Sequence, residues 1–380
     1  MEKILCITND FGPRAGGIET FVIGLIERLP KGSVIVYTSA QDNSKEYDRK
    51  WLEDYGVEVL RDKAKILLPT PGVSFCVNSL VRDRQITTVF FGAAAPLGLL
   101  SRGLRKAGVQ RIVALTHGHE VWWSRIWPFT QAMKTIAKQV DHLTYLGEFT
   151  QRAISKAISP KAAQAMVKIA PGIDTDHFAP VDASQLRDQL GVSDKKVIVS
   201  VGRLVHRKGQ DTLIEAMPEI LTQIPDAHIV MIGEGPYRAY LENRAKALNV
   251  QGSVTFIGRI QYADLPRYIC TGDIFVMPSR SRLAGLEVEG LGIVYLEASA
   301  CGLPVIAGDS GGAPDAVLEG KTGLVVDGRS SREVAKAVIE LLSDEKRCKE
   351  MGALGRQWII SEWRWDIWAK NFTDLLKVSR

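Results

Sequence analysis

The feature that most constrains the fold is an alternation of short, apolar, β-branched runs with longer amphipathic segments. Such runs, each ended by Gly or Pro and followed by a helical pattern, are typical of parallel sheets whose strands are joined by helices. The alternation occurs twice, so we predict an α/β chain with two doubly wound, Rossmann-like domains. The expected strands cover residues 4–8, 34–38, 88–91, 112–116, 142–146 and 167–170 in the first half, and 195–202, 227–235, 254–258, 273–278, 303–308 and 323–326 in the second.

Between the two halves lies a polar segment, "PGIDTDHFAP" at residues 171–180, which fits neither period and has a proline at each end. It predicts a boundary between an N-terminal domain, residues 1–175, and a C-terminal domain, residues 176–360. Open α/β sheets bind ligands beyond the carboxyl ends of their strands. We therefore expect two domains that face a cleft, with functional residues in the loops that follow the strands.

Charge and cysteine content limit the classes of partner. The chain carries 48 Lys and Arg against 43 Asp and Glu, a net charge of +5 with a pI of about 8.8. This balance favours anionic ligands or an anionic membrane surface, and the lack of any block of basic residues argues against nucleic acid. The five cysteines show no CxxC spacing, which predicts a reduced, cytosolic chain. Without a secretory signal or a run of about 18 apolar residues, a soluble or peripheral protein is expected.

A glycine-rich turn, "NDFGPRAGGIETF", follows the first expected strand and precedes an expected helix at residues 18–29. The backbone N–H groups near Gly16 and Gly17 could hold an anion, because glycine allows close approach and the start of a helix carries positive potential. The alternative is a turn without a ligand. No GxGxxG pattern follows the strand, so a dinucleotide fingerprint is absent.

Two cations follow the first strand of the second domain, in "VGRLVHRKGQ". Arg203 comes directly after the apolar run, and Lys208 lies just before the next helical pattern. Cations at a strand end suit a diphosphate, because arginine binds phosphate oxygens with a planar fork and lysine acts as a point charge. We interpret Arg203 and Lys208 as diphosphate ligands and Arg207 as a solvated loop residue.

Two glutamates, Glu289 and Glu297, flank the segment "GLGIVYL". The N–H groups of Gly292, Ile293 and Val294 would be donors at the positive end of a new helix. Because Glu297 falls within an apolar helix, its carboxylate needs hydroxyl or cationic partners. A nucleotide sugar along this turn could supply phosphates to the N–H groups and hydroxyls to the carboxylates. The alternative is a Glu297 that pairs with a structural Arg or Lys.

These motifs together resemble the retaining glycosyltransferases of family 4, and the resemblance covers nearly the whole chain. It is carried by "VGRLVHRKG", "FIGRI", "DIFVMPSR", "EVEGLGIVYLEASACGLPVIAGDSGGAPDAV" and "GLVVDG". The resemblance implies the two-Rossmann fold called GT-B and a nucleotide-activated sugar as donor. It also implies attack on the same face as the leaving diphosphate, with no enzyme nucleophile. The family signature of a glutamate, seven residues and a second glutamate is matched by Glu289 and Glu297.

The resemblance also implies a role for each site residue. Arg203 and Lys208 would bind the diphosphate, Glu289 the hydroxyls of the donor sugar, and Glu297 the ribose. The other implied contacts are Gly16 and Gly17 on the phosphates, Ile260 and Val294 on the nucleotide, and His117 beside the sugar. His119 is the alternative to His117 in this role, and each of the two could instead be a structural residue.

Within the family, "SRLAGLEVEGLGIVYLEA" and "THGHEVWW" resemble the actinobacterial GDP-mannose-dependent phosphatidylinositol monomannoside mannosyltransferases. This narrower resemblance implies GDP-mannose as donor, a phosphatidylinositol mannoside as acceptor, an α-1,6 linkage and attachment to the inner face of the cell membrane. We expect no metal, since the only DxD-like pattern, residues 174–176, falls in the linker. Leu291, where phenylalanine is usual, and a longer loop at residues 279–287 depart from the commoner pattern. We interpret Glu287, a competitor of Glu289, as an exposed loop charge.

Three other functions stay open. A non-hydrolysing sugar-nucleotide epimerase shares the architecture, but it needs acid and base side chains on both faces of the sugar. A family 4 glycosyltransferase with another nucleotide sugar or a soluble acceptor is the nearer rival. A sugar-nucleotide-binding regulator would keep Arg203 and Lys208 yet need no second substrate pocket. The oligomeric state is also left open.

Two aromatic segments complete the predictions. The spacing of Trp365, Trp368 and Phe372 predicts a helix in residues 361–380, which in the family crosses back onto the N-terminal domain. Residues 121–138 combine aromatic with basic side chains, as membrane-interface segments do, although aromatic residues at this spacing also occur in cores. The side chains concerned are Trp122, Trp123, Trp127 and Phe129 with Arg125, Lys134 and Lys138.

Overall fold

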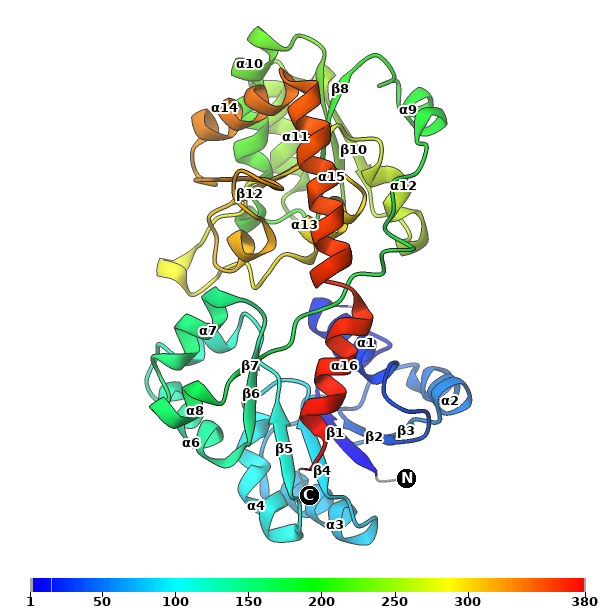
Figure 1. The fold of residues 1–380 in the computed structure, drawn as a ribbon, viewed down its shortest axis with the longest axis vertical. Helices are drawn as coiled ribbons and strands as arrows, with labels where there is room; N and C mark the ends of the chain where they lie inside the picture. Colours follow the sequence, from blue (N-terminus) through cyan, green and yellow to red (C-terminus); the bar gives the residue numbers. More distant parts are fainter. Residues whose placement is uncertain (1–2, 15, 379–380) are drawn as a thin grey trace. The chain divides into compact units, whose positions relative to one another are not determined.

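The computed structural model describes residues 3–14 and 16–378, and the chain divides into two compact units (Figure 1). Unit 1 contains the chain up to Gly172 together with the C-terminal residues from Trp365, and unit 2 runs from Ile173 to Arg364. Each unit has one parallel sheet covered by helices. The predicted α/β class with two Rossmann-like domains is confirmed. None of the helices among the described residues is both long and apolar enough to span a bilayer.

The sheet of unit 1 has the strand order β3-β2-β1-β4-β5-β6-β7, and its neighbouring strands pair in parallel. The order reverses between β1 and β4. The strands are β1 (Ile4–Thr8), β2 (Val34–Thr38), β3 (Glu58–Arg61), β4 (Thr88–Phe91), β5 (Arg111–Ala114), β6 (His142–Tyr145) and β7 (Val167–Lys168). The helices are α1 (Gly17–Ile26), α2 (Ser44–Tyr55), α3 (Pro71–Asp83), α4 (Ser101–Ala107), α5 (Glu120–Trp123), α6 (Phe129–Gln139), α7 (Glu148–Ser155), α8 (Pro160–Gln164) and α16 (Trp365–Leu376).

The sheet of unit 2 has the order β10-β9-β8-β11-β12-β13, again parallel, with the reversal between β8 and β11. Its strands are β8 (Lys196–Val201), β9 (Ala227–Ile232), β10 (Val254–Gly258), β11 (Ile274–Met277), β12 (Val305–Gly308) and β13 (Gly323–Val326). Its helices are α9 (Ser184–Leu190), α10 (Gln210–Gln223), α11 (Arg238–Ala247), α12 (Leu265–Ile269), α13 (Ile293–Ala300), α14 (Ser331–Leu342) and α15 (Glu345–Glu362).

Alternate residues of each central strand serve the two faces of its sheet. In unit 1, Ile7 and Phe91 belong to a core shared with α3, α4 and α6. Phe90 points to the other face and meets Phe372 of α16 edge-on, with ring centroids 5.2 Å apart. In unit 2, one core face packs against α10, α11 and α14, whereas Phe275 on the opposite face contacts Tyr295 of α13. Central strands buried on both faces explain why they are continuous apolar runs in the sequence.

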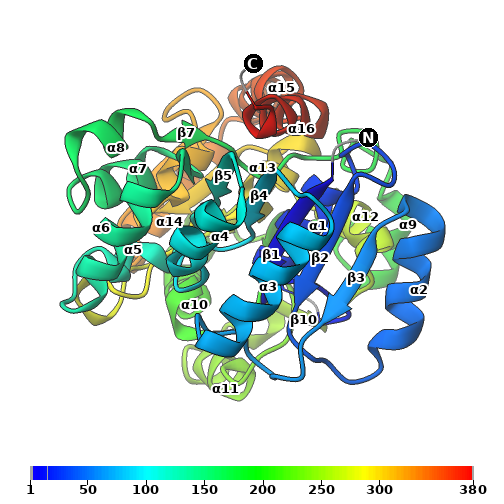
Figure 2. The ribbon, with the colours of Figure 1, turned by 90° about the horizontal axis from the view of Figure 1, so that it is seen from below.

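The sequence-based prediction missed β3, which lies at the edge of the sheet beside α2 (Figure 2). Its sequence, Glu58–Arg61, is half charged, and each of its residues is only partly buried. An edge strand needs a single paired neighbour, so it lacks the apolar run that marks a central strand. Helix α1 also ends at Ile26, earlier than the predicted residue 29, and Pro30 disfavours a helical conformation in the residue before it.

Candidate active site

The reversal of strand order in unit 2 brings two loops together at the carboxyl ends of β8 and β11. This is where open α/β sheets bind ligands. Gly209, in the loop after β8, has a positive φ of 72°, and a Cβ there would lie 1.8 Å from the carbonyl oxygen of Pro278, which follows β11. Only glycine permits this approach. The close packing of the two loops places Lys208 against Glu289.

The carboxylate of Glu289 binds two cations. Lys208 Nζ and Arg207 Nη1 each lie 2.7 Å from the same oxygen, Oε2. Burial raises the pKa of the Glu289 carboxyl, but attraction by Lys208 and Arg207 outweighs it and holds the pKa below its usual value. Glu289 is therefore ionised at neutral pH, and among the described residues none donates a hydrogen bond to its Oε1. The prediction that Arg207 is a solvated residue is wrong.

Arg203, the other predicted diphosphate ligand, has an exposed side chain. Within the described part of the chain, no hydrogen bond or ion pair holds its guanidinium, and only its carbonyl accepts a bond, from Gln210. The two predicted cations thus differ: Lys208 is buried and bound to a carboxylate, whereas Arg203 is available to an anion from solution.

The turn before α13 depends on glycine. Gly292 has a left-handed conformation with φ of 78°, and a Cβ there would meet the Tyr295 ring at 2.4 Å. The N–H groups of Ile293 and Val294 have no partner within the helix, as at any helix start. Both side chains are half-buried, as is that of Ile260, which follows β10. The N–H groups at the start of α13 and the side chains of Val294 and Ile260 are therefore partly accessible to a ligand.

Glycines after β12 support the same turn, and sequence reasoning missed them. Gly312 donates its N–H to the carbonyl of Glu289 at 2.8 Å, and a Cβ on Gly312 would lie 2.1 Å from the carbonyl oxygen of Gly290. Ser310 Oγ accepts the N–H of Glu289 at 3.2 Å. The signal was present as "DSGGAP" directly after a strand.

Glu297 lies one turn further along α13 and is 6% exposed. No side chain among the described residues pairs with its carboxylate. Within this part of the chain, the alternative that Glu297 pairs with a structural Arg or Lys is therefore wrong. Burial raises the pKa of this carboxyl to about 7. A buried acid without a partner is unfavourable unless a ligand supplies donors, and this is the strongest sign of a ligand in unit 2.

A second buried ion pair braces the loop after β11. Arg280 contacts Asp211 Oδ2 at 2.5 Å and Thr212 Oγ1 at 2.8 Å, both on α10. The backbone N–H of Arg280 donates to the carbonyl of Arg207 at 2.8 Å. This bond fixes the backbone of Arg207, whose side chain binds Glu289. Glu287, interpreted as an exposed charge, has a side chain that is 38% exposed, and it is also paired with Arg282 at 3.0 Å and lies 3.8 Å from Arg207.

In unit 1, the backbone and ring of His117 are held by hydrogen bonds. Its ring Nε2 lies 2.7 Å from the carbonyl oxygen of Gly92, and its backbone N–H donates to Glu120 Oε2 at 2.7 Å. Burial lowers the pKa of the His117 ring, and the attraction of Glu120 only partly offsets it. Since a carbonyl can only accept, the neutral ring carries its proton on Nε2, which leaves Nδ1 as a hydrogen-bond acceptor.

His119 differs from His117 in charge. Its Nε2 forms an ion pair with Glu120 Oε1 at 3.1 Å, and the ring also interacts with the Ala95 backbone. Burial acts to lower the pKa of His119, but Glu120 outweighs it and raises the pKa to about 9. His119 is therefore cationic at neutral pH, while Glu120, with its pKa lowered to about 2 mainly by His119 against the effect of burial, is ionised. Sequence reasoning did not find this pair.

The glycine-rich turn of unit 1 contains acidic groups that were not expected. A Cβ on Gly16 would lie 2.2 Å from the Glu19 carboxylate, whereas a Cβ on Gly17 would meet nothing within 4 Å. Glu19 is buried and bound by Arg14 at 2.7 Å. Burial, followed by the charge of Glu19, raises the pKa of Asp10 to about 6. The space over Gly17 is open, as close approach by an anion requires.

The linker carboxylate Asp174 has a local role. Its Oδ1 accepts the N–H groups of Asp176 and His177 at 3.1 and 3.0 Å, which caps a turn. Three or more His, Cys, Asp or Glu side chains do not gather into a potential metal site anywhere in the described ranges.

Comparison with known proteins places the chain in a family. Residues 15–177 match the family model described as glycosyltransferase family 4, and residues 182–358 match that described as glycosyl transferases group 1. The chain is 43% identical to a GDP-mannose-dependent alpha-(1-6)-phosphatidylinositol monomannoside mannosyltransferase of Mycolicibacterium smegmatis, over 99% of both sequences. It is 41% identical to a GDP-mannose-dependent monoacylated alpha-(1-6)-phosphatidylinositol monomannoside mannosyltransferase of Corynebacterium glutamicum, over 99% of this chain and 98% of the other.

Solved structures show the same fold. Anabaena Alr3699/HepE in complex with UDP superposes with a TM-score of 0.82 at 19% identity, over 98% of this chain and 99% of that one. Sucrose-phosphate synthase from Thermosynechococcus elongatus gives a TM-score of 0.79 at 23% identity, over 98% of each chain. The resemblance drawn from the sequence motifs is thereby confirmed. The chain belongs to the family 4 glycosyltransferases, with the GT-B fold of two Rossmann-like domains.

Proposed function

We propose that this protein transfers mannose from GDP-mannose to a phosphatidylinositol mannoside acceptor, with retention of the anomeric configuration. The observation that carries the proposal is the identity of 41–43% over essentially the full chain to enzymes named for this reaction. The cluster of Arg207, Lys208 and Glu289 supports it, because it combines cations for a phosphate with an ionised carboxylate for hydroxyl groups.

In the proposed complex, Arg203 and Lys208 bind the diphosphate. Lys208 has three N–H donors and uses one on Glu289, so others remain for phosphate oxygens. Glu289 accepts hydroxyl hydrogens of the mannose through Oε1, and Glu297 accepts those of the ribose. The N–H groups of Gly292, Ile293 and Val294 direct the partial positive charge of the helix start at the phosphates. Gly16 and Gly17 provide further backbone contacts, and Ile260 lies beside the nucleotide.

Bond cleavage would leave negative charge on the diphosphate and positive charge on the sugar. The fixed cations stabilise the departing diphosphate, an effect that is typically the largest single contribution to catalysis. A phosphate oxygen then takes the proton of the attacking acceptor hydroxyl. His117, neutral and with a free Nδ1 acceptor, would orient a sugar hydroxyl rather than exchange protons.

A donor and acceptor screen tests the proposal. With a phosphatidylinositol monomannoside acceptor, we expect turnover with GDP-mannose and at most about 1% of that rate with UDP-glucose or UDP-N-acetylglucosamine, since correct positioning of the donor contributes several kcal/mol. Linkage analysis should give an α-1,6 product. The reaction should proceed equally well with excess chelator, because Arg203 and Lys208 neutralise the diphosphate. Preference for another donor, or activity restored only by Mg²⁺, would contradict the proposal.

Glu297 predicts a pH dependence of nucleotide binding. Its pKa is about 7 without ligand, and ribose hydroxyls bind the ionised form, so the pKa must fall on binding. By linkage, GDP should bind about tenfold more tightly at pH 8 than at pH 6, with the loss occurring as the pH falls through 7. Calorimetry should compare the wild type with Glu297→Gln. Ionisation of GDP itself affects both proteins equally, so the difference between them isolates the contribution of the Glu297 carboxyl. An equal pH dependence in the two proteins would rule out ribose binding by Glu297.

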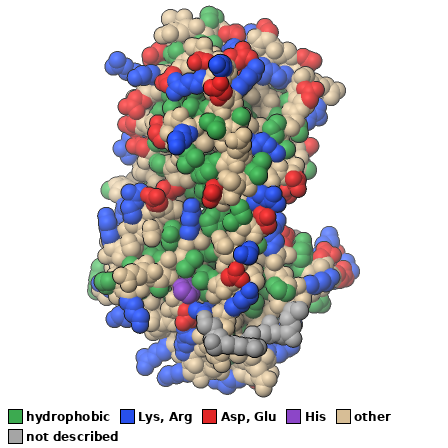
Figure 3. Space-filling view, viewed as in Figure 1, with side chains coloured by type: hydrophobic (Ala, Val, Ile, Leu, Met, Phe, Trp, Pro, Cys, Tyr) green, Lys and Arg blue, Asp and Glu red, His purple; other side chains and the backbone are tan. Residues whose placement is uncertain are grey.

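We further propose that residues 121–138 attach the enzyme to an anionic membrane surface. Trp127 is 77% exposed, whereas Trp122 and Trp123 are half-buried and pack on Phe129. Lys134 and Lys138 are also exposed. Over much of the face that Figure 3 shows, basic and acidic side chains are interspersed. An exposed Trp with nearby lysines suits the headgroup region.

Co-sedimentation with liposomes that contain phosphatidylinositol tests this attachment. We expect the double variant Trp127→Ala, Lys134→Glu to bind at least fivefold more weakly than the wild type, since each basic residue near an anionic surface contributes about 1 kcal/mol. The matched control is Leu354→Ala, Lys346→Glu, which removes an exposed apolar and an exposed basic side chain from unit 2. Equal losses in the two variants would show that the segment has no special role.

A further inference from the structure

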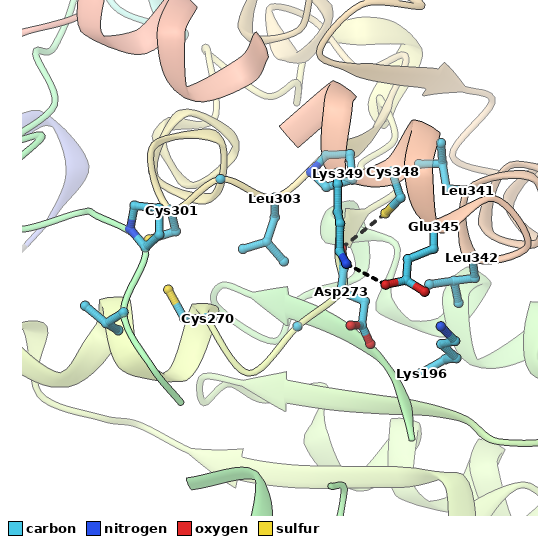
Figure 4. Close-up of a pocket in the computed structure, with 15 residues that line it drawn as sticks. Lys196, Cys270, Asp273, Cys301, Leu303, Leu341, Leu342, Glu345, Cys348 and Lys349 are labelled. Atoms are coloured by element: carbon cyan, nitrogen blue, oxygen red, sulfur yellow. Dashed lines mark hydrogen bonds and ion pairs between the residues drawn. The ribbon is translucent and has the colours of Figure 1, made fainter. Parts of the chain in front are cut away.

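A cavity of about 290 Å³ lies in unit 2 at the amino ends of its strands (Figure 4). Lys196 begins β8, Asp273 precedes β11 and Pro304 precedes β12, and all three line the cavity. The cavity is therefore at the opposite edge of the sheet from Lys208 and Glu289, which follow β8 and β11. None of the proposed catalytic residues lines it, yet three of the five cysteines do.

Two of these cysteines stand at the ends of neighbouring helices. Cys270 directly follows α12, and Cys301 directly follows α13, with which α12 is in contact. Both thiols line the cavity, and the Cys270 thiol donates a hydrogen bond to the carbonyl oxygen of Ala179 at 3.6 Å. Figure 4 shows the two side chains together at one end of the cavity, with Leu303 between them and Cys348. Cys348 is engaged elsewhere, because its thiol donates to the carbonyl oxygen of Asp273 at 3.5 Å.

The two thiols differ in accessibility and in chemistry. Cys270 is half-exposed and Cys301 is buried. The neighbouring Cys301 thiol lowers the pKa of Cys270 to about 7 against the effect of burial, with smaller contributions from the Val181 backbone and Arg356. The neighbouring Cys270, together with burial, raises the pKa of Cys301. A partly exposed thiol of lowered pKa with a second thiol in the same cavity is the arrangement found in redox-sensitive cysteines.

We propose that Cys270 and Cys301 form a dithiol site that hydroperoxides oxidise to an intramolecular disulfide. The thiolate of Cys270 attacks one oxygen of hydrogen peroxide and breaks the O–O bond, which forms a sulfenic acid and a hydroxide that takes up one proton and leaves as water. The sulfur of Cys301 then attacks the sulfenic sulfur, and its proton leaves with the hydroxyl as a second water. Two thiols and one hydrogen peroxide thus yield one disulfide and two waters, and a dithiol reductant reverses the change.

The position of Cys301 couples this site to the proposed nucleotide site. Its backbone N–H donates to the carbonyl of Glu297 at 3.0 Å, in the last turn of α13. A disulfide requires the two sulfurs to approach to about 2.05 Å. The bond would join the end of α13 covalently to the end of α12, one helical turn from Glu297. We expect the disulfide to weaken GDP binding, a consequence that rests on the proposed function, whereas the disulfide itself does not.

Peptide mapping of the full chain tests the pair directly. After treatment with one equivalent of hydrogen peroxide and alkylation of the remaining thiols, we expect a cross-linked peptide that joins Cys270 to Cys301. A Cys76→Ser background removes the exposed thiol of unit 1. Cys270→Ser must abolish the cross-link, and Cys348→Ser, which alters the same cavity, must not. A sulfinic acid at Cys270, or a disulfide that uses Cys348, would overturn the proposal.

Calorimetry with GDP then tests the coupling. The oxidised protein should bind GDP at least threefold more weakly than the reduced protein, dithiothreitol should restore the affinity, and peroxide should not change the affinity of Cys270→Ser. An unchanged affinity in a protein that maps as fully cross-linked would overturn the coupling. If the reduced protein failed to bind GDP at all, the proposed function would be wrong, while the peptide map would still decide the disulfide.

Discussion

Glu289→Gln should lower the turnover of GDP-mannose by about 100-fold or more, which corresponds to about 2.7 kcal/mol of transition-state stabilisation. The substitution keeps the size of the side chain but removes the negative charge that Lys208 and Arg207 share. If the glutamine amide nitrogen faced Lys208 and Arg207, its N–H groups would oppose the N–H donors of these two side chains. The cations would shift, and the acceptor for the mannose hydroxyls would be lost at the same time.

Steady-state kinetics with Glu287→Gln as the matched control separates this effect from a general change in the loop. Glu287 lies two residues before Glu289 and binds Arg282 and Arg207, but it is 38% exposed. Its substitution should change turnover by less than about fivefold, because exposed ion pairs contribute at most about 1 kcal/mol. Near-normal turnover in Glu289→Gln, or equal losses in both variants, would remove Glu289 from the active site.

Phe372→Ala should destabilise unit 1 by about 3–5 kcal/mol, as expected for a fully buried phenylalanine. The side chain is 0% exposed and lies against Phe90 of β4, while Thr88 Oγ1 donates to the carbonyl of Leu376 at the end of α16. Because α16 covers strands β4 and β5, the cavity would open in the core of unit 1. Removal of all residues after Ser361 should have a larger effect.

Hydrogen exchange resolved by peptide reports the two units separately. In Phe372→Ala, amides of β4 and β5 should exchange faster by at least 100-fold, while those of β8 and β11 in unit 2 keep their protection. Asn371→Ala, an exposed neighbour on α16, serves as the control and should change stability by no more than about 0.5 kcal/mol. Loss of protection spread evenly over both units would contradict the assignment of α16 to unit 1.

The sequence by itself determined the class of fold and most of the strand positions. Buried parallel strands are apolar throughout, so β1, β2 and β8 could be recognised without any knowledge of their neighbours. Lys208 and Glu289 could be singled out for a related reason: each lies in a loop that follows a strand, and in a parallel sheet all such loops meet at one edge. The family resemblance drew on the same local patterns.

Only the tertiary structure decided which side chains meet within that edge. Arg207 and Glu289 are 82 residues apart, and nothing in the local pattern of either distinguishes a solvated arginine from one that binds a buried carboxylate. The same holds for Glu297, whose lack of a partner is a property of everything packed around it, and for Cys270 with Cys301, which stand at the ends of different helices. Propensity and periodicity act over a few residues, whereas ion pairs, burial and the pKa changes that follow from them depend on groups that folding brings together from distant parts of the chain.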